Sequence, residues 1–208
     1  MKEQIRYSAA VLLTAVVCCG NDCVEVGVTD EGFHVADDGV ELYPGKLPAA
    51  LGIDTTVTDV TLLPEVLDRW NAWLSRDGVA RTVLVVAEEA ETPRAVVSIG
   101  FVPAPDWGET FIDGDVADPA EITYLDYDLE TGEVLGAEIV LSSDIAYDRD
   151  TLVDVLSHGV GHFLALADDP GPPATVDLKS VMASPMDPLG ELTKADFDRL
   201  LPYLPSEE

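Results

Sequence analysis

The sequence predicts one α/β (α+β) domain in which a mostly parallel sheet carries amphipathic helices. Thr82–Ala87 and Ala95–Val102 are continuous runs rich in β-branched residues, which is typical of strands buried on both faces. Leu63–Ser75 and Asp150–Ala167 repeat apolar residues at the spacing of a helix with one buried face. The order of buried strands and amphipathic helices favours a mostly parallel sheet.

Residues 1–19 predict an export signal that is not part of the fold. A short positive start precedes the apolar run Ala9–Val17, which is too short to span a bilayer. The run ends at Cys18 and Cys19, where a bacterial lipoprotein carries its lipid, although the residues before them fit that signal poorly. An ordinary cleaved signal is the alternative. We therefore expect an exported bacterial-type protein that is secreted, periplasmic or lipid-anchored at the cell envelope.

Residues 20–46 form a lead-in rich in glycine and aspartate, for which we expect a hairpin or an irregular arm. Residues 47–205 form the main domain. All three cysteines lie before Val24, so no disulfide can form within the later chain. The domain must be held together by its apolar core, and its length is sufficient for one.

The elements of the main domain follow one another in a readable order. Ala50–Val57 predicts a strand, and it is followed by the helix Leu63–Ser75 and by the two buried strands. Ile122–Leu129 and Val134–Leu141 alternate in polarity about a Glu-Thr-Gly-Glu turn, which predicts a hairpin. A final helix is expected over Thr193–Leu201.

The charge balance is strongly acidic, with a formal net charge of −29. Such a chain repels nucleic acid and anionic membrane surfaces, so neither is expected as a partner. An acidic surface binds divalent cations and keeps a protein soluble, and a monomer is expected. A solvated surface without a specific ligand explains most of this charge equally well.

Two histidines give the most specific indication of chemistry. His158 and His162 stand four residues apart within the helix Asp150–Ala167, which Asp148 and Asp150 can cap. This spacing places both imidazoles on one helical face, as in the zinc-binding motif H-E-x-x-H. Histidines at this spacing also occur on helices for packing alone.

Four segments in order resemble the metzincin zinc metalloproteases, in particular the matrixin-like branch. They are the strand Ala137–Ser142, the helix with the two histidines, the turn Ser180-Val-Met182, and the helix start Glu191–Asp198. The resemblance runs from about Leu47 to Pro205. It implies a metzincin-like twisted, mostly parallel sheet with an active-site helix and a C-terminal helix.

The resemblance also implies a zinc site, with departures from the family motif H-E-x-x-H-x-x-G-x-x-H. Gly159 replaces the glutamate and Ala165 replaces the glycine of a sharp turn. Asp168 stands in the place of the third histidine, as in the snapalysins, and a carboxylate is a good zinc ligand. The implied ligands are therefore His158, His162 and Asp168. Met182 corresponds to the methionine of the Met-turn beneath the metal.

The missing glutamate decides the functional expectation. General acid–base catalysis raises the rate of a reaction ~10²–10⁴-fold, and a glycine side chain cannot provide it. We expect an exported metzincin-fold protein that has a zinc site and binds a peptide or protein in its cleft. Its peptidase activity should be weak or absent, and the substitution Gly159→Glu should raise that activity. One alternative is an active zinc endopeptidase that uses another base. A second is a calcium-binding or structural surface protein, with Asp113, Asp115 and Asp118 as calcium ligands in an otherwise solvated acidic loop.

Overall fold

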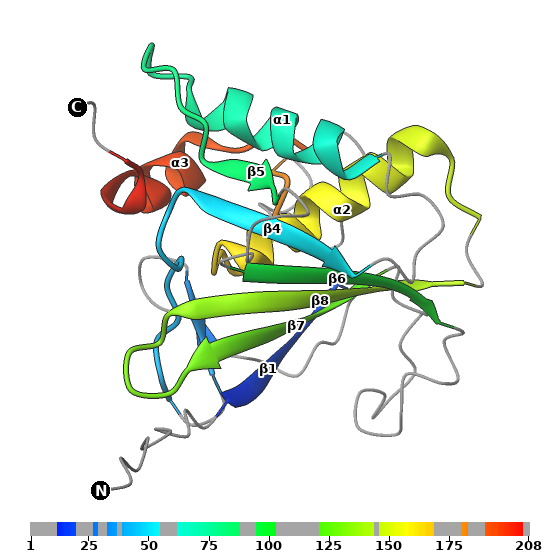
Figure 1. Ribbon diagram of the computed structural model, residues 1–208, viewed down its shortest axis with the longest axis horizontal. Helices are drawn as coiled ribbons and strands as arrows, with labels where there is room; N and C mark the ends of the chain where they lie inside the picture. The colour runs from blue at the N-terminus through cyan, green and yellow to red at the C-terminus, as the bar shows by residue number, and fades with distance from the viewer. Residues whose placement is uncertain are drawn as a thin grey trace, which may run out of the picture.

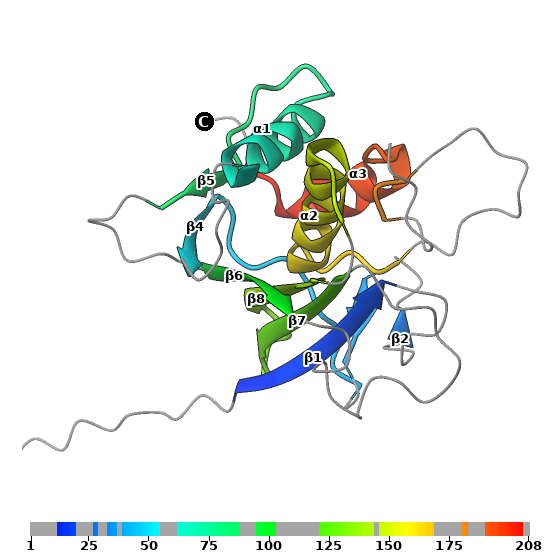
Figure 2. The same ribbon diagram turned by 90° about the vertical axis from the view of Figure 1, so that its right-hand side faces the viewer.

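The computed structural model describes residues 12–19, 27–28, 33–36, 39–54, 62–87, 95–102, 121–143, 146–168, 180–182 and 190–205. Within them the chain has an α+β fold in which a mixed sheet carries helices on one face (Figure 1, Figure 2). The residues Asp113, Asp115 and Asp118, which are the expected calcium ligands, lie outside the described residues.

The main sheet has six strands in the order β1-β7-β8-β6-β4-β5. Their bounds are β1 Leu12–Cys19, β4 Ala49–Asp54, β5 Leu84–Val86, β6 Ala95–Val102, β7 Glu121–Asp128 and β8 Val134–Ser142. The neighbours from β5 through β4 and β6 to β8 run parallel. In contrast, β7 runs antiparallel to β8, and β1 runs antiparallel to β7. A separate antiparallel pair is formed by β2 Gly27–Val28 and β3 His34–Val35.

The expected strands lie close to their expected positions. β6 matches its prediction, and β7 and β8 form the predicted hairpin. The prediction for Thr82–Ala87 is wrong in one respect, because β5 is not buried on both faces. Val85 and Val86 are 37% and 39% exposed, since β5 ends the described sheet and pairs with β4 alone. A β-branched run predicts a strand, but it does not say whether the strand lies inside the sheet or at its edge.

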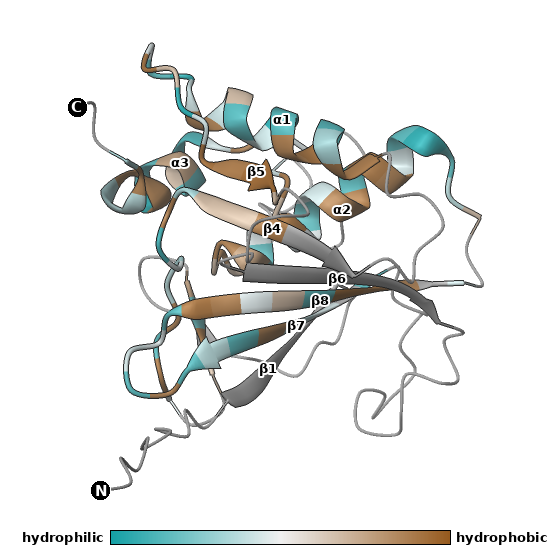
Figure 3. Cartoon of the chain, viewed as in Figure 1, coloured by the Kyte–Doolittle hydropathy of each residue, from teal (hydrophilic) through white to brown (hydrophobic). Residues whose placement is uncertain are grey.

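The helix α1, Leu63–Leu74, packs against the helix α2, Arg149–Phe163. Figure 3 shows the apolar residues of α1 on the side that faces α2 and polar residues on the opposite side. The indole Nε1 of Trp70 donates a hydrogen bond to the Ser157 carbonyl over 3.0 Å, which fixes one helix against the other.

Side chains cap both of the later helices. Asp148 accepts a hydrogen bond from the Thr151 backbone N–H over 2.8 Å, as the sequence predicts for the start of α2. Thr193 and Asp196 form a capping box at the start of α3, Lys194–Leu200, which continues as the short 3-10 helix η3, Leu201–Tyr203. None of the helices in the described residues is long and apolar enough to cross a membrane.

Part of the lead-in belongs to the same core as the main domain. Phe33, Ala36 and Leu42 are buried in the cluster that contains the apolar residues of α1, α2 and the sheet. The backbone N–H of His34 also donates to the Ala165 carbonyl over 3.1 Å. The segment is therefore an integrated part of the fold, and it passes directly beneath the end of α2.

Candidate metal centre

The structure brings His158, His162 and Asp168 together at the end of α2. The two imidazole Nε2 atoms lie 2.9 Å apart, and Asp168 Oδ1 lies 3.2 Å from His158 Nε2 and 3.5 Å from His162 Nε2. Ligands ~2.0–2.1 Å from a tetrahedral zinc ion are themselves ~3.3 Å apart, so these spacings fit one ion. Both imidazoles are fully buried.

A left-handed turn after α2 returns Asp168 to the histidines. The helix ends at Phe163, earlier than predicted, because Ala165 adopts a φ of +62°. The Leu166 N–H then donates to the Gly161 carbonyl over 3.1 Å, which closes the helix end. The sequence predicted a helix through Ala167, and a left-handed conformation at a residue other than glycine costs about 1 kcal/mol.

Backbone carbonyls orient both imidazoles. His158 Nδ1 lies 2.7 Å from the Val181 carbonyl, and His162 Nδ1 lies 3.0 Å from the Leu166 carbonyl. A proton on each Nδ1 satisfies these acceptors and leaves the Nε2 lone pairs to face one another and Asp168. Hydrogen bonds of this kind fix the tautomer and the ring orientation of metal-binding histidines.

The third histidine of the chain, His34, also lies at this site, and no sequence pattern predicted that position. It is 3% exposed, and its Nε2 lies 3.0 Å from His162 Nδ1. Burial first and the nearby His158 second lower the pKa of His34 to about 3. His34 is therefore neutral and contacts the back of a ligand without being one of the three clustered ligands.

Met182 packs beneath the histidine-bearing face. It is fully buried, and a Cβ at Gly161 would collide with its Sδ atom and approach its Cε to 3.1 Å. The preceding residue, Val181, supplies the carbonyl that orients His158. The Ser180–Met182 turn thus contributes both a packing surface and a hydrogen bond to the site.

A buried carboxylate occupies the space beside Gly159. A Cβ built on Gly159 would lie 2.5 Å from Glu121 Oε1 and 2.9 Å from Ile139 Cδ1. Glu121 is the first residue of β7 and is fully buried. Thr123 donates a hydrogen bond to its Oε1 over 2.5 Å, while its Oε2 has no hydrogen-bond partner among the described residues.

The cluster has strongly perturbed protonation in the absence of a cation. Burial lowers the pKa of His158, but the Asp168 and Glu121 carboxylates outweigh it and raise the value to about 9. Burial and the positive charge of His158 keep the pKa of His162 well below its usual range. Burial raises the pKa of Asp168, yet the two histidines together hold it below its usual value. Burial raises the pKa of Glu121 to about 7.

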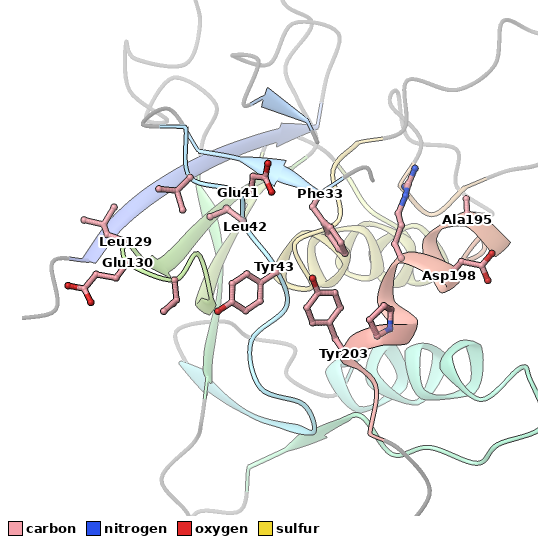
Figure 4. A pocket seen from close by; sticks show the side chains of 13 residues that line it. Phe33, Glu41, Leu42, Tyr43, Leu129, Glu130, Ala195, Asp198 and Tyr203 are labelled. Atoms are coloured by element: carbon pink, nitrogen blue, oxygen red, sulfur yellow. The ribbon is translucent and has the colours of Figure 1, made fainter. Parts of the chain in front are cut away.

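A larger open pocket of about 790 Å³ lies apart from these ligands (Figure 4). Phe33, Tyr43 and Tyr203 line it, and the rings of Tyr43 and Tyr203 stack with their centroids 6.0 Å apart. None of the three clustered ligands lines this pocket. The pocket is therefore separate from the candidate metal centre.

No protein-family model matches the chain, and no curated protein matches its sequence. A function must therefore be argued from the chemistry of the site.

Sequence reasoning found the three clustered residues but missed Glu121 and His34. The sequence did hold a signal for Glu121, because Glu121, Thr123, Leu125 and Tyr127 alternate with their neighbours and share the buried face of β7. A glutamate on an inward strand face is uncommon and indicates a specific role or partner. His34 carries no such local signal, since its contact with His162 spans 128 residues.

Proposed function

We propose that this chain is a zinc-binding protein with a metzincin-like scaffold, which holds zinc through His158, His162 and Asp168. The observation that carries the proposal is the convergence of the two Nε2 atoms and Asp168 Oδ1 within 3.5 Å of one another. Asp168 Oδ1 is buried, and it lies within ion-pair distance of both imidazoles. A cation between the three atoms would satisfy it.

The donor set suits zinc in kind as well as in spacing. Two neutral imidazoles and one carboxylate are a combination that catalytic zinc sites use, with a further position open to substrate or water. When bound at such a site, zinc polarises a carbonyl group and lowers the pKa of water. The protein contributes the rigid helix, the carbonyls that orient both rings and the exclusion of bulk solvent.

Several features support the metzincin-like assignment. The histidine-bearing helix α2 lies against the β7–β8 hairpin, the chain turns sharply after it, and a methionine packs beneath it. The parallel strands β5, β4, β6 and β8 are followed in the sheet by the antiparallel strand β7.

The outer edge of β7 supports a peptide as the partner. β1 pairs with this edge from Leu12 opposite Asp128 to Cys19 opposite Glu121. The edge can thus accept an extended chain along its whole length, which is how strand addition recognises peptides. Because β1 falls within the proposed export signal, cleavage of that signal would free the edge for another peptide near the zinc ligands.

The localisation remains part of the proposal. The apolar leader and the acidic composition support an exported protein, whether secreted, periplasmic or tethered to a membrane by lipid on Cys18 or Cys19. Mass spectrometry of the protein recovered from a bacterial host distinguishes the lipid-tethered form from the other two, because lipidation adds a defined mass to the new N-terminal cysteine.

Two levels of activity are compatible with this site. Gly159 itself supplies no base, which supports a protein that binds peptides and cleaves them weakly or not at all. The second candidate is an active zinc endopeptidase that uses another base. The buried Glu121 carboxylate beside Gly159 favours this second candidate.

Zinc binding is tested first by metal analysis of the purified full-length chain after dialysis. We expect one zinc per chain in the wild type and loss of stoichiometric zinc in His162→Ala and Asp168→Asn. Asp198→Asn is the matched control, because Asp198 is 52% exposed and paired with Lys194 far from the ligands in sequence. Equal zinc content in the wild type and in both ligand variants would contradict the proposal.

A further inference from the structure

We propose that Glu121 is the catalytic carboxylate of this site and performs from strand β7 the role that Gly159 cannot perform from helix α2. The inference rests on the proposed zinc function and deepens it. It has two independent observations behind it: the place of the carboxylate and the unpartnered state of one of its oxygens.

The first observation is position. The Cα–Cβ direction at residue 159 is the direction in which a glutamate of H-E-x-x-H would leave the helix. Glu121 Oε1 lies 2.5 Å from that Cβ position, so the two side chains cannot both occupy the space. Glycine at 159 is the residue that admits a carboxylate arriving from the sheet, which explains why a helix interior keeps a residue that costs about 1 kcal/mol there.

The second observation is hydrogen bonding. Thr123 lies on the same face of β7 and donates to Glu121 Oε1, which holds the carboxylate in one orientation. Oε2 is buried and has no partner among the described residues. A buried carboxylate oxygen without a partner is expensive unless a ligand, water or proton satisfies it. One oxygen is thus anchored while the other is available for proton transfer.

Glu121 alone can accept and return the proton that moves during peptide hydrolysis. A water oxygen bonds to the carbonyl carbon of the peptide, and one of its protons passes to Glu121 Oε2. The carbon–nitrogen bond then breaks, and Glu121 returns the proton to the leaving nitrogen. The products are a carboxylic acid and an amine, and no oxidant or further reactant is needed.

Two other roles of Glu121 make different predictions. As a fourth zinc ligand, it would contribute to metal affinity, and Glu121→Gln would weaken zinc binding. As a purely structural group held by Thr123, it would affect folding stability but neither zinc nor cleavage. The proposed catalytic role predicts loss of cleavage with zinc affinity retained.

The experiment measures zinc affinity by chelator competition and cleavage of fluorescently labelled casein. Both use the chain recovered after export from a bacterial host, because β1 otherwise covers the edge of β7. For Glu121→Gln we expect an unchanged zinc stoichiometry, a zinc Kd within about threefold of wild type, and cleavage reduced ~10²–10⁴-fold. Glu138→Gln is the matched control, because Glu138 is exposed on the neighbouring strand β8. It should change neither quantity.

A relocated carboxylate provides the second arm. Glu121→Ala should lose casein cleavage. The double variant Glu121→Ala with Gly159→Glu should cleave casein at least about tenfold faster than Glu121→Ala alone. Contrary to the expectation from the sequence alone, the single change Gly159→Glu should not raise activity, because the new side chain would meet both Glu121 and Ile139. Rescue by the double variant is a result that a merely structural Glu121 would not produce.

The outcomes separate this inference from the function on which it rests. A wild type without stoichiometric zinc overturns both. A wild type that binds zinc but does not cleave casein, or a Glu121→Gln variant that cleaves normally, overturns the inference alone. Loss of zinc in Glu121→Gln also overturns it, in favour of a ligand role.

Discussion

Gly159 and Gly161 are separated by one residue on α2 and lie between His158 and His162, but they open onto different surroundings. Beside Gly159 the nearest atom to a built Cβ belongs to the Glu121 carboxylate, followed by the tip of Ile139. Beside Gly161 it is the Met182 sulfur, with Trp70 Cζ2 at 3.3 Å. Gly159 leaves room for the carboxylate at the end of the Glu121 side chain, whereas Gly161 allows Met182 and Trp70 to pack closely against the helix. The same residue type thus serves chemistry on one side of the helix and packing on the other.

The largest expected change in folding stability is on the Gly159 side of α2, where the Glu121 carboxylate is buried. Burial raises the pKa of Glu121 from 4.5 to about 7, and it is partly opposed by the facing His158 and reinforced by Asp168. Glu121 therefore contributes stability below pH 4.5, and this contribution is lost as the pH rises through about 7. The shift corresponds to on the order of 3 kcal/mol. Glu121→Gln should remove this loss, so the metal-free variant should be more stable than the wild type at pH 9.

Urea unfolding of the metal-free proteins at pH 4.5 and pH 9 measures this difference. Glu138→Gln again serves as the control and should follow the wild type at both values of pH. If Glu121→Gln were no more stable than the wild type at pH 9, the carboxylate would be solvated and the contrast between the two glycines would disappear.

A smaller loss of stability is expected on the Gly161 side. Gly161→Ala places a methyl group against Met182 and Trp70, both fully buried. Overpacking of this kind costs about 1–3 kcal/mol, and the higher helix propensity of alanine returns about 1 kcal/mol. Because the added Cβ would collide with the Met182 sulfur, we expect the upper end of this cost and a net destabilisation of about 2 kcal/mol by urea unfolding at pH 7. A neutral or stabilising result would mean that Met182 can move aside and does not pack tightly beneath the helix.

The smallest effect on stability is expected for Gly159→Ala. The new methyl group meets the ends of the Glu121 and Ile139 side chains. Both ends can shift, at the cost of the hydrogen bond from Thr123 to Glu121, and alanine favours the helix by about 1 kcal/mol. The free energy of unfolding should stay within about 1 kcal/mol of wild type, while casein cleavage falls because the carboxylate is displaced. A destabilisation equal to that of Gly161→Ala, or unimpaired cleavage, would show that the two glycines do not differ in the way described.

The sequence by itself determined those features that depend on neighbouring residues. The four-residue spacing put His158 and His162 on one face of α2, and Asp148 was correctly placed as its cap. These features follow from helix geometry and local hydrogen bonds, which act over a few residues. The end of α2 was not determined in this way, because the pattern predicted a helix through Ala167, whereas Ala165 adopts a left-handed conformation.

Only the tertiary structure decided which groups surround that helix. The edge position of β5, the contact of His34 with His162 and the approach of Glu121 to Gly159 each depend on how distant segments pair or pack. A glycine in a sequence records an absent side chain but not what fills the space. At Gly159 that space holds a carboxylate from another element, because the register of β7 against β8 brings Glu121 beside α2.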